Sequence, residues 1–160
     1  MKDKVRLEVL DRREFVLGAA AAAAVAALLA DARLAAAQEK APTFEEALKK
    51  LIGAAKPEEG KVSLELPEIA ENGNTVPFTV SVESPMTDKE YVKAVHVLST
   101  GNPQPAVASF RFTPDSGKAS VASRMRLAKT QDVVSIAELS DGRFLIGKRN
   151  VKVTIGGCGG

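Results

Sequence analysis

The chain has 160 residues, of which 45% are hydrophobic, and its 22 basic and 20 acidic side chains leave a formal charge of only +2. A single domain is the expectation for this length. The nearly balanced charge and the 4% of aromatic residues exclude both a strongly basic surface and a stacking platform for bases, so no nucleic-acid partner is expected.

The first 37 residues have the pattern of an export signal. A charged stretch ends in Arg12 and Arg13, an uncharged and mostly alanine run follows at 15–30, and small residues at 35–37 precede Gln38. This is the order of an n-region, an h-region and an A-x-A cleavage site. The alternative is a membrane-spanning helix, but the run is shorter than the roughly 18 to 20 apolar residues that a span requires.

The paired arginines and the weakly hydrophobic alanine core are similar to a twin-arginine signal. Because that route carries folded proteins, we expect export of a folded chain to the periplasm. Removal of residues 1–37 would leave a mature protein of residues 38–160 without a membrane anchor. It would hold a single cysteine, which cannot form an internal disulfide bond.

The mature chain begins with one predicted helix in the stretch "TFEEALKKLIGAAK". Thr43 is a plausible N-cap, and Glu46 completes a capping box with it. Apolar residues recur at helical spacing with charged residues between them. The helix is expected to end near Gly53 or Pro57. Its apolar positions are Phe44, Ala47, Leu48, Leu51 and Ile52.

The rest of the body reads as strands and turns. Seven segments alternate or are apolar throughout, and the separators between them are rich in Gly, Pro, Asn and Asp. We therefore predict a mainly β fold, an immunoglobulin-like β-sandwich of about seven strands with one short N-terminal helix, over residues 38–155. It is open whether Arg143 to Ile155 forms one strand or two around Gly147. The segments are "KVSLEL", "TVPFTVSVE", "YVKAVHVLST", "AVASFRFT", "KASVASRMRLA", "DVVSIAEL" and "RFLIGKRNVKVTI".

The body offers no recognisable active site. Its only histidine, His96, lies in a predicted strand, where a packed or hydrogen-bonded side chain is the simpler account, and it lacks the companions that a metal site needs. The acidic pairs in helical or turn contexts are expected to be solvated surface, and the basic cluster near the tail is expected to be a charged strand face. No bound cofactor, metal site or enzymatic activity is predicted. The pairs are Glu45-Glu46, Glu58-Glu59 and Glu68/Glu71, and the cluster is Lys148, Arg149 and Lys152.

The chemistry is concentrated in the terminal stretch "VTIGGCGG". Cys158 is flanked by Gly156, Gly157, Gly159 and Gly160, which make residues 156–160 a thin and flexible arm with an extended length of about 17 Å. The nearby terminal carboxylate disfavours the thiolate, so the thiol should react only when a partner supplies positive charge. This favours a covalent handle that enters narrow channels in other proteins.

Two other interpretations of Cys158 remain open beside that of a covalent handle. A structural β-sandwich with a stable intermolecular disulfide through Cys158 would also explain an odd cysteine in an exported protein. A redox enzyme subunit is less favoured, because the sequence has no second cysteine for a resolving thiol.

Several stretches resemble the SoxY family, the sulfur-carrying subunits of bacterial thiosulfate-oxidising complexes. They are the twin-arginine-like leader, "LPEIAENGNTVP", "SPMT", "NPQPAVASFRFTP", "RLAKTQDVV" and the terminal "VTIGGCGG".

The resemblance implies that Cys158 is the covalent attachment site for sulfur, as an S-thiosulfonate, S-sulfonate or persulfide. It implies a heterodimer with SoxZ, for which the apolar strand at 91–100 is a candidate face, and joint export of the folded pair. It also implies transient docking to the haem enzyme SoxAX, the hydrolase SoxB and, where present, the sulfane dehydrogenase SoxCD. On this reading the protein is a carrier and a substrate rather than an enzyme.

Overall fold

The computed structural model describes residues 41–156. The predicted export signal, including Arg12 and Arg13, and the arm residues Gly157, Cys158, Gly159 and Gly160 lie outside this range. Within 41–156, no helix combines the length and the apolar character that crossing a membrane requires.

Helix α2 spans Phe44–Ile52 and begins with the predicted capping box. The Thr43 amide donates to the Glu46 carboxylate over 2.7 Å, and the Glu46 amide donates to the Thr43 hydroxyl over 3.2 Å. The helix ends where Gly53 takes a positive φ of 61° and donates its amide to the Lys49 carbonyl, a conformation that favours glycine. Both predicted helix ends are therefore confirmed.

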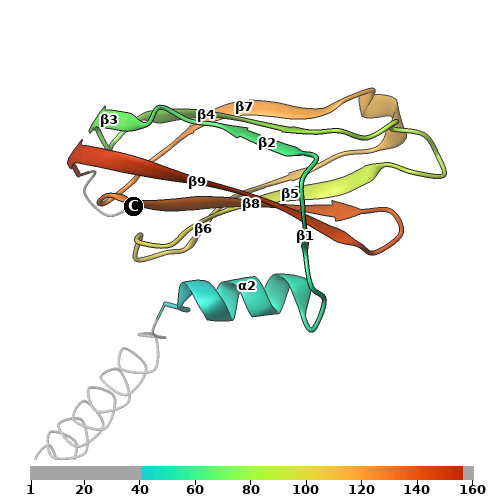
Figure 1. Cartoon of the computed structure of the whole chain (residues 1–160), viewed down its shortest axis with the longest axis horizontal. Coiled ribbons are helices and arrows are strands. Elements are labelled where there is room, and N and C mark those ends of the chain that lie inside the picture. Colours follow the sequence, from blue (N-terminus) through green and yellow to red (C-terminus); the bar gives the residue numbers. More distant parts are fainter. Residues whose placement is uncertain (1–40, 157–160) are drawn as a thin grey trace, which may run out of the picture. The chain divides into compact units, whose positions relative to one another are not determined.

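Nine strands follow in the described range, and a 3-10 turn at Pro114–Ser116 precedes the seventh (Figure 1). Two of the nine, β1 and β3, are not among the seven predicted strands. Each is short and pairs with β9, which is distant in the sequence. The strands are β1 Glu58–Glu59, β2 Val62–Glu65, β3 Ile69–Asn72, β4 Val76–Val82, β5 Val92–Ser99, β6 Ala106–Arg111, β7 Ala119–Met125, β8 Gln131–Leu139 and β9 Phe144–Ile155.

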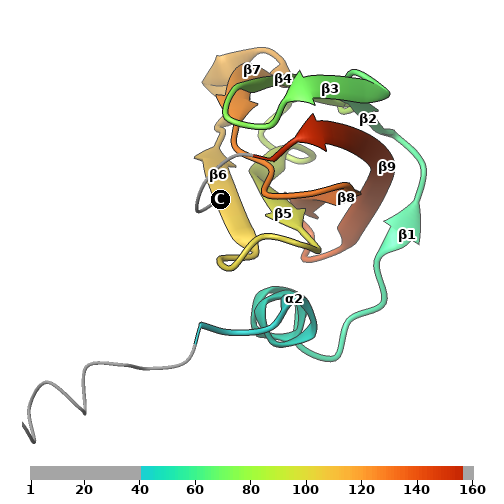
Figure 2. The same cartoon turned by 90° about the vertical axis from the view of Figure 1, so that its left-hand side faces the viewer.

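The strands form two sheets that face each other (Figures 1 and 2). The larger sheet has the order β1-β9-β8-β5-β6, with β3 also paired to β9, and the smaller sheet has the order β2-β4-β7. Most neighbours are antiparallel, but β1 and β3 both pair parallel with β9. The predicted mainly β sandwich with a short N-terminal helix is confirmed.

Strand β9 is one continuous strand of twelve residues that passes through Gly147. A Cβ at Gly147 would lie 2.9 Å from Val62 Cγ1 and 3.0 Å from the Val62 carbonyl oxygen. Both are shorter than an ordinary contact between these atoms, so glycine lets β2 of the smaller sheet approach β9 closely. Residues Arg143 to Ile155 therefore contain one strand rather than two, and Gly147 is explained by close packing between the sheets rather than by a break in the strand.

The core fills the space between the two sheets, and a second apolar cluster lies between the larger sheet and α2. In β5, Val95 and Val97 belong to the core between the sheets, whereas Leu98 belongs to the cluster that faces the helix. This explains why β5 is apolar on both faces. Burial of each such side chain contributes about 1.5–3 kcal/mol relative to its exposure. The helix contributes Phe44, Leu48, Leu51 and Ile52 to the second cluster, over Leu98, Val134 and Ile136.

Candidate functional site

The described part of the arm begins where β9 ends, at one end of the sandwich. Figure 2 looks at this end, with β3 and β9 running toward the viewer. Three loops lie at this end: they join β3 to β4, β5 to β6 and β7 to β8. We call residues 71–75, 100–104 and 126–130 together the collar.

The side chain of Asn102 joins two loops of the collar. Its amide nitrogen donates to the Arg126 carbonyl over 2.8 Å, and its oxygen accepts from the Ala128 amide over 2.9 Å. The same oxygen accepts from the side chain of Gln131 over 2.8 Å. Gln131 is 5% exposed and accepts the Gly101 amide over 2.6 Å. Each end of the Asn102 amide is therefore satisfied, which fixes its orientation.

The third loop is tied to the strand that leads into the arm. The Gly73 amide donates to the Ile155 carbonyl over 2.7 Å, and the Gly73 carbonyl accepts from the Leu127 amide over 2.8 Å. Gly73 is buried, so its backbone groups need these partners. One residue thus links the last residue of β9 to the loop that holds Ala128.

Two threonine hydroxyls add to this anchoring of β9. Thr154 donates to the Glu71 carbonyl over 2.9 Å, and the Thr130 hydroxyl accepts from the Val153 amide over 3.0 Å. Hydrogen bonds of this kind contribute about 0.5–1.5 kcal/mol each. The last residues of β9 before the arm are therefore hydrogen-bonded both to the loop at 71–75 and to the loop at 126–130.

Gly156 lies directly against the collar. A Cβ at this position would lie 2.2 Å from the carbonyl oxygen of Ala128 and 3.2 Å from its carbonyl carbon. No real Cβ approaches backbone oxygen so closely, so only glycine fits while the loop stays in place. The sequence assigned Gly156 to the flexible arm, whereas the structure gives it the role of a close contact with the body.

His96 lies in β5 opposite Ser109 of β6, and its Nδ1 is 2.8 Å from the Ser109 hydroxyl. Burial lowers the pKa of His96, the negative charge of Glu138 opposes this shift, and the positive charge of Arg111 adds to it. The hydrogen-bonded histidine predicted from the sequence is confirmed. No group of three or more potential metal ligands occurs among residues 41–156.

Lys148, Arg149 and Lys152 of β9 are all exposed, as predicted for a charged surface. They do not form one face, because neighbouring residues of a strand point to opposite sides, and Arg149 therefore points away from the side of Lys148 and Lys152. Lys148 forms an ion pair of 2.8 Å with Asp132. The hydrogen bonds that Lys148 and Asn150 donate to the Asp132 carboxylate lower the pKa of Asp132.

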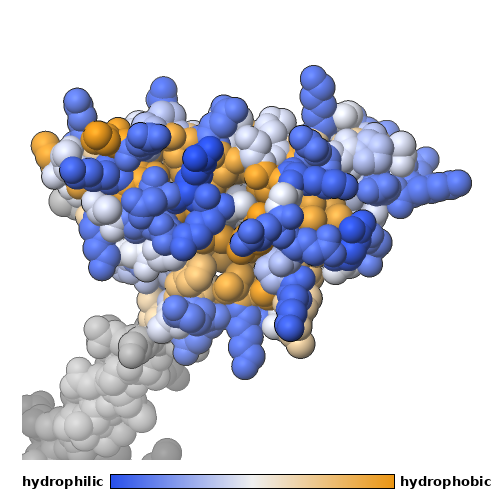
Figure 3. Space-filling view, viewed as in Figure 1, coloured by the Kyte–Doolittle hydropathy of each residue, from blue (hydrophilic) through white to orange (hydrophobic). Residues whose placement is uncertain are grey.

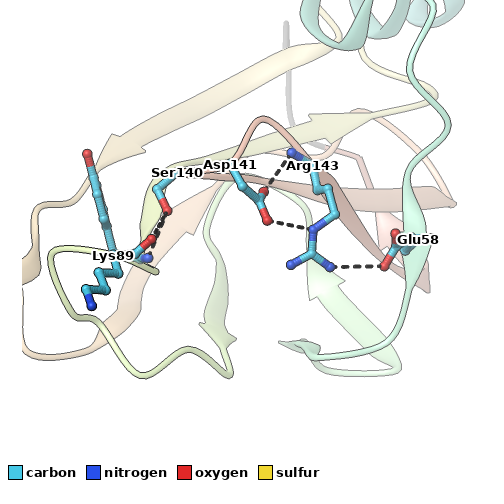
Figure 4. Close-up of polar contacts among 6 residues, drawn as sticks. Glu58, Lys89, Ser140, Asp141 and Arg143 are labelled. Carbon is cyan, nitrogen blue, oxygen red and sulfur yellow. Dashed lines mark hydrogen bonds and ion pairs between the residues drawn. The ribbon is translucent and has the colours of Figure 1, made fainter.

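At the opposite end of the sandwich, Arg143 forms ion pairs with two carboxylates (Figure 4). Arg143 Nε lies 2.7 Å from Asp141, and its Nη1 lies 3.7 Å from Glu58 of β1. The Arg143 amide and side chain both lower the pKa of Asp141. Ser140 accepts the Tyr91 amide beside this group. Glu58-Glu59 forms strand β1 rather than the predicted helical or turn segment, and both residues are exposed, as predicted.

Sequence reasoning placed the collar loops only among the separators between the predicted strands. It did not assign roles to Asn102, Gln131, Gly73 or Ala128. A signal was present, because three of the stretches that resemble the SoxY family, "LPEIAENGNTVP", "NPQPAVASFRFTP" and "RLAKTQDVV", contribute to the collar. What the sequence could not show is that these stretches meet around Gly156.

The fold and the site define a class of small two-sheet β-sandwich proteins. In this class the last strand is hydrogen-bonded to the loops around its end, and a glycine-rich C-terminus with a cysteine follows it. Comparison with protein families narrows this class. Residues 48–158 match the family of the sulfur oxidation protein SoxY, and the chain belongs to this family.

Solved structures agree with this assignment. The chain is similar to the sulfur carrier protein SoxY from Chlorobium limicola f. thiosulfatophilum, with a TM-score of 0.60 and 33% identity over 71% of this chain and 97% of that chain. A comparison with curated proteins finds no match.

Two superoxide reductases share the fold alone. The enzyme from Ignicoccus hospitalis has a TM-score of 0.53 and 16% identity, over 59% of this chain and 80% of that chain. The enzyme from Nanoarchaeum equitans has a TM-score of 0.51 and 11% identity, over 61% and 99%. The sandwich is thus a scaffold that accommodates different chemistry.

Proposed function

We propose that this protein is a periplasmic sulfur carrier that holds intermediates of thiosulfate oxidation covalently on Cys158. The observation that carries the proposal is the extent of the family match, which runs from residue 48 to residue 158 and so includes the chain's only cysteine. The similar structure from Chlorobium is described as a sulfur carrier protein. The braced exit of β9 supports the same role, because a carrier arm needs a firm base.

Loading joins the Cys158 sulfur to the outer sulfur of thiosulfate. The thiol loses one proton, and the thiol and thiosulfate together lose two electrons, which the haem enzyme SoxAX accepts. The product is a cysteine S-thiosulfonate with one negative charge. The protein supplies the thiol, and the partner supplies the oxidant and the positive charge that favours the thiolate.

Unloading by SoxB is a hydrolysis. Water attacks the sulfonate sulfur, the bond between the two outer sulfur atoms breaks, and sulfate, a proton and a cysteine persulfide form. No electrons are exchanged in this step. SoxCD, where present, accepts six electrons from the outer sulfur of the persulfide, and three water molecules supply the oxygen atoms of the cysteine S-sulfonate that forms. A second hydrolysis then releases sulfate and returns the free thiol. The carrier is a covalent substrate in each step rather than an enzyme.

The remaining parts of the proposal rest on the sequence pattern of the leader and on the resemblance to the SoxY family. Residues 1–37 direct twin-arginine export, residues 38–155 form the sandwich, and residues 156–160 form the arm. The sandwich pairs with SoxZ as a heterodimer, and the pair is exported folded.

Intact mass measurement tests the proposal. The mature protein and its heterodimer partner are incubated with thiosulfate and the haem enzyme, and the C-terminal peptide is then mapped. We expect an adduct that is removed by a reducing thiol and is absent from Cys158→Ser. A wild-type protein without adduct, or an adduct that persists in Cys158→Ser, would contradict the carrier role.

A further inference from the structure

We propose that Asn72 is a site of spontaneous deamidation, and that the hydrogen bond between the Gly73 amide and the Ile155 carbonyl limits its rate. The modification needs only water, so it is independent of the proposed function. It couples a covalent change in the loop at 71–75 to release of the last residue of β9. The reactive pair is Asn72-Gly73, the only asparagine–glycine sequence in the chain.

The reaction is an attack of the Gly73 main-chain nitrogen on the side-chain amide carbon of Asn72. A bond forms between these atoms, ammonia leaves with the proton of the Gly73 amide, and a cyclic succinimide remains. Water then opens the ring at one of its two carbonyl carbons. Opening at the side-chain carbonyl gives aspartate, whereas opening at the main-chain carbonyl gives isoaspartate, in which the main chain runs through the former side chain. No electrons are exchanged in either step.

The side-chain amide of Asn72 is accessible and held in place. Asn72 is exposed at the end of β3, and Figure 3 shows hydrophilic atoms at the left-hand end of the sandwich, where β3 and β9 end in Figure 1. The Asn72 side-chain oxygen accepts the Asn74 amide over 2.9 Å. This donor faces the oxygen on which negative charge develops when the nitrogen adds, and donors so placed lower the barrier. Gly73 has no side chain that could shield its nitrogen.

The attacking nitrogen, in contrast, is held back by the body of the protein. Gly73 is buried, its amide donates to the Ile155 carbonyl over 2.7 Å, and its carbonyl accepts from the Leu127 amide over 2.8 Å. While the first bond persists, the amide proton is shielded from base and the nitrogen cannot turn toward the Asn72 side chain. Attack therefore requires a local opening that separates Gly73 from Ile155. Such openings occur at free energies that can lie well below that of global unfolding.

Isoaspartate would make this opening permanent. Asn72 is the residue of β3 that pairs with Ile155 of β9. Isoaspartate lengthens the main chain by one carbon atom at this position, which displaces the Gly73 amide from the Ile155 carbonyl. Aspartate keeps the main chain and the side-chain oxygen that bonds the Asn74 amide, so it should leave the pairing intact. The two products therefore differ in their effect on the end of β9.

A second pair of the same kind is protected by its surroundings. Asp141 precedes Gly142 in the turn between β8 and β9, and an aspartic acid can form the same ring by loss of water. Its two oxygens accept hydrogen bonds from Arg143, one from the main-chain amide over 3.0 Å and one from Nε over 2.7 Å. These bonds hold the pKa of Asp141 low, and an ionised carboxylate is a poor target for a nucleophile. The Asn72 side chain is uncharged and lacks this protection.

Peptide mapping by mass spectrometry tests the proposal. The mature protein is incubated at mildly alkaline pH, where the amide nitrogen loses its proton more readily, in water enriched in heavy oxygen, which marks deamidation that precedes digestion. The reference is the peptide acetyl-Ala-Glu-Asn-Gly-Asn-Thr-amide. We expect the protein to react about a hundredfold more slowly than the peptide, since opening breaks three hydrogen bonds that each stabilise the segment several-fold. They are the two of Gly73 and the one from Thr154 to the Glu71 carbonyl.

Two glycine variants test the role of Ile155. In Gly156→Ala the new Cβ would lie 2.2 Å from the Ala128 carbonyl oxygen, which moves residue 155 away from Gly73. Deamidation should then be about fivefold faster, the factor that one hydrogen bond of ordinary strength represents. The matched control is Gly147→Ala, which strains the contact between the sheets at a distance from this loop, so its rate should stay within about twofold of the wild type.

The separated products test the consequence for β9. In the isoaspartate form, hydrogen exchange at the Gly73 and Leu127 amides should be at least about tenfold faster than in the wild type, because both lose their partners. Asn72→Asp, which has the charge without the longer main chain, should exchange like the wild type. Wild-type exchange in the isoaspartate form would show that the end of β9 does not depend on this residue.

The remaining outcomes decide the site and its limitation separately. Wild-type protein that reacts as fast as the peptide, or equal rates in Gly156→Ala and Gly147→Ala, would overturn the role of the bond to Ile155. If Asn72 stays unmodified in Gly156→Ala while the peptide reacts, the site itself is refuted. None of these results bears on the carrier role, because Cys158 takes no part in the reaction.

Discussion

Replacing Gly156 by alanine tests whether the arm leaves the body at a fixed point. The new Cβ would lie 2.2 Å from the Ala128 carbonyl oxygen, about 1 Å closer than the roughly 3.3 Å at which carbon and oxygen ordinarily meet. The Ala128 amide is bonded to Asn102 and the neighbouring Leu127 amide is bonded to Gly73, so the loop resists displacement. The chain at 155–156 should move outward instead.

This outward movement breaks the hydrogen bond from Gly73 to Ile155, which contributes about 1 kcal/mol. For a domain of this size, the melting temperature should fall by about 4 °C. The larger effect should be on turnover of the loaded arm, because a misplacement of about 1 Å at a reacting group can cost on the order of a hundredfold in rate. We expect a loss of about tenfold or more in kcat/KM for sulfate release.

Gly147→Ala is the matched control for this change. Its Cβ would meet Val62 at 2.9 and 3.0 Å between the two sheets, and overpacking of this kind costs about 1–3 kcal/mol. Its thermal stability should therefore fall at least as far, while turnover below the unfolding temperature should match the wild type. Thermal unfolding and steady-state kinetics on both variants check this. Equal turnover by Gly156→Ala and the wild type, or an equal loss in Gly147→Ala, would refute the role of Gly156.

Three further predictions concern the collar, the sheet and the leader. Asn102→Ala removes the partners of two backbone groups and of the Gln131 side chain, so urea unfolding should show a loss of about 1–3 kcal/mol; a wild-type midpoint would show that the network is dispensable. Because the folded-state pKa of His96 is lowered, its stabilising contribution is complete above the unfolded value of about 6.5 and is lost as the pH falls toward the folded value. The urea midpoint should therefore drop between pH 7.5 and 5, and His96→Gln should flatten that slope; an unchanged slope would assign it to other groups. Lys in place of both Arg12 and Arg13 should keep the protein in the cytoplasm, as measured by cell fractionation, and normal export would reject the twin-arginine route.

Local features of the fold were predictable from the sequence because they depend on neighbouring residues. The capping box of Thr43 and Glu46 and the stop at Gly53 use contacts within a few residues. The alternation in "TVPFTVSVE" indicates one buried face for β4, which the structure confirms. His96 was expected to be hydrogen-bonded, although its partner Ser109 was not identified.

The sequence alone identified Cys158 as the candidate attachment site, since it is the only cysteine and is enclosed by glycines. Only the tertiary structure brought together the loops at 71–75, 100–104 and 126–130, because their contacts join residues separated by 23 positions or more in the chain. It also decided that β1 and β3 pair with β9, since such short strands are specified by a distant partner. The role of Gly156 also depends on a residue that is distant in the sequence. A glycine can provide backbone flexibility or allow a close approach of another segment, and the segment that approaches Gly156 is the carbonyl of Ala128.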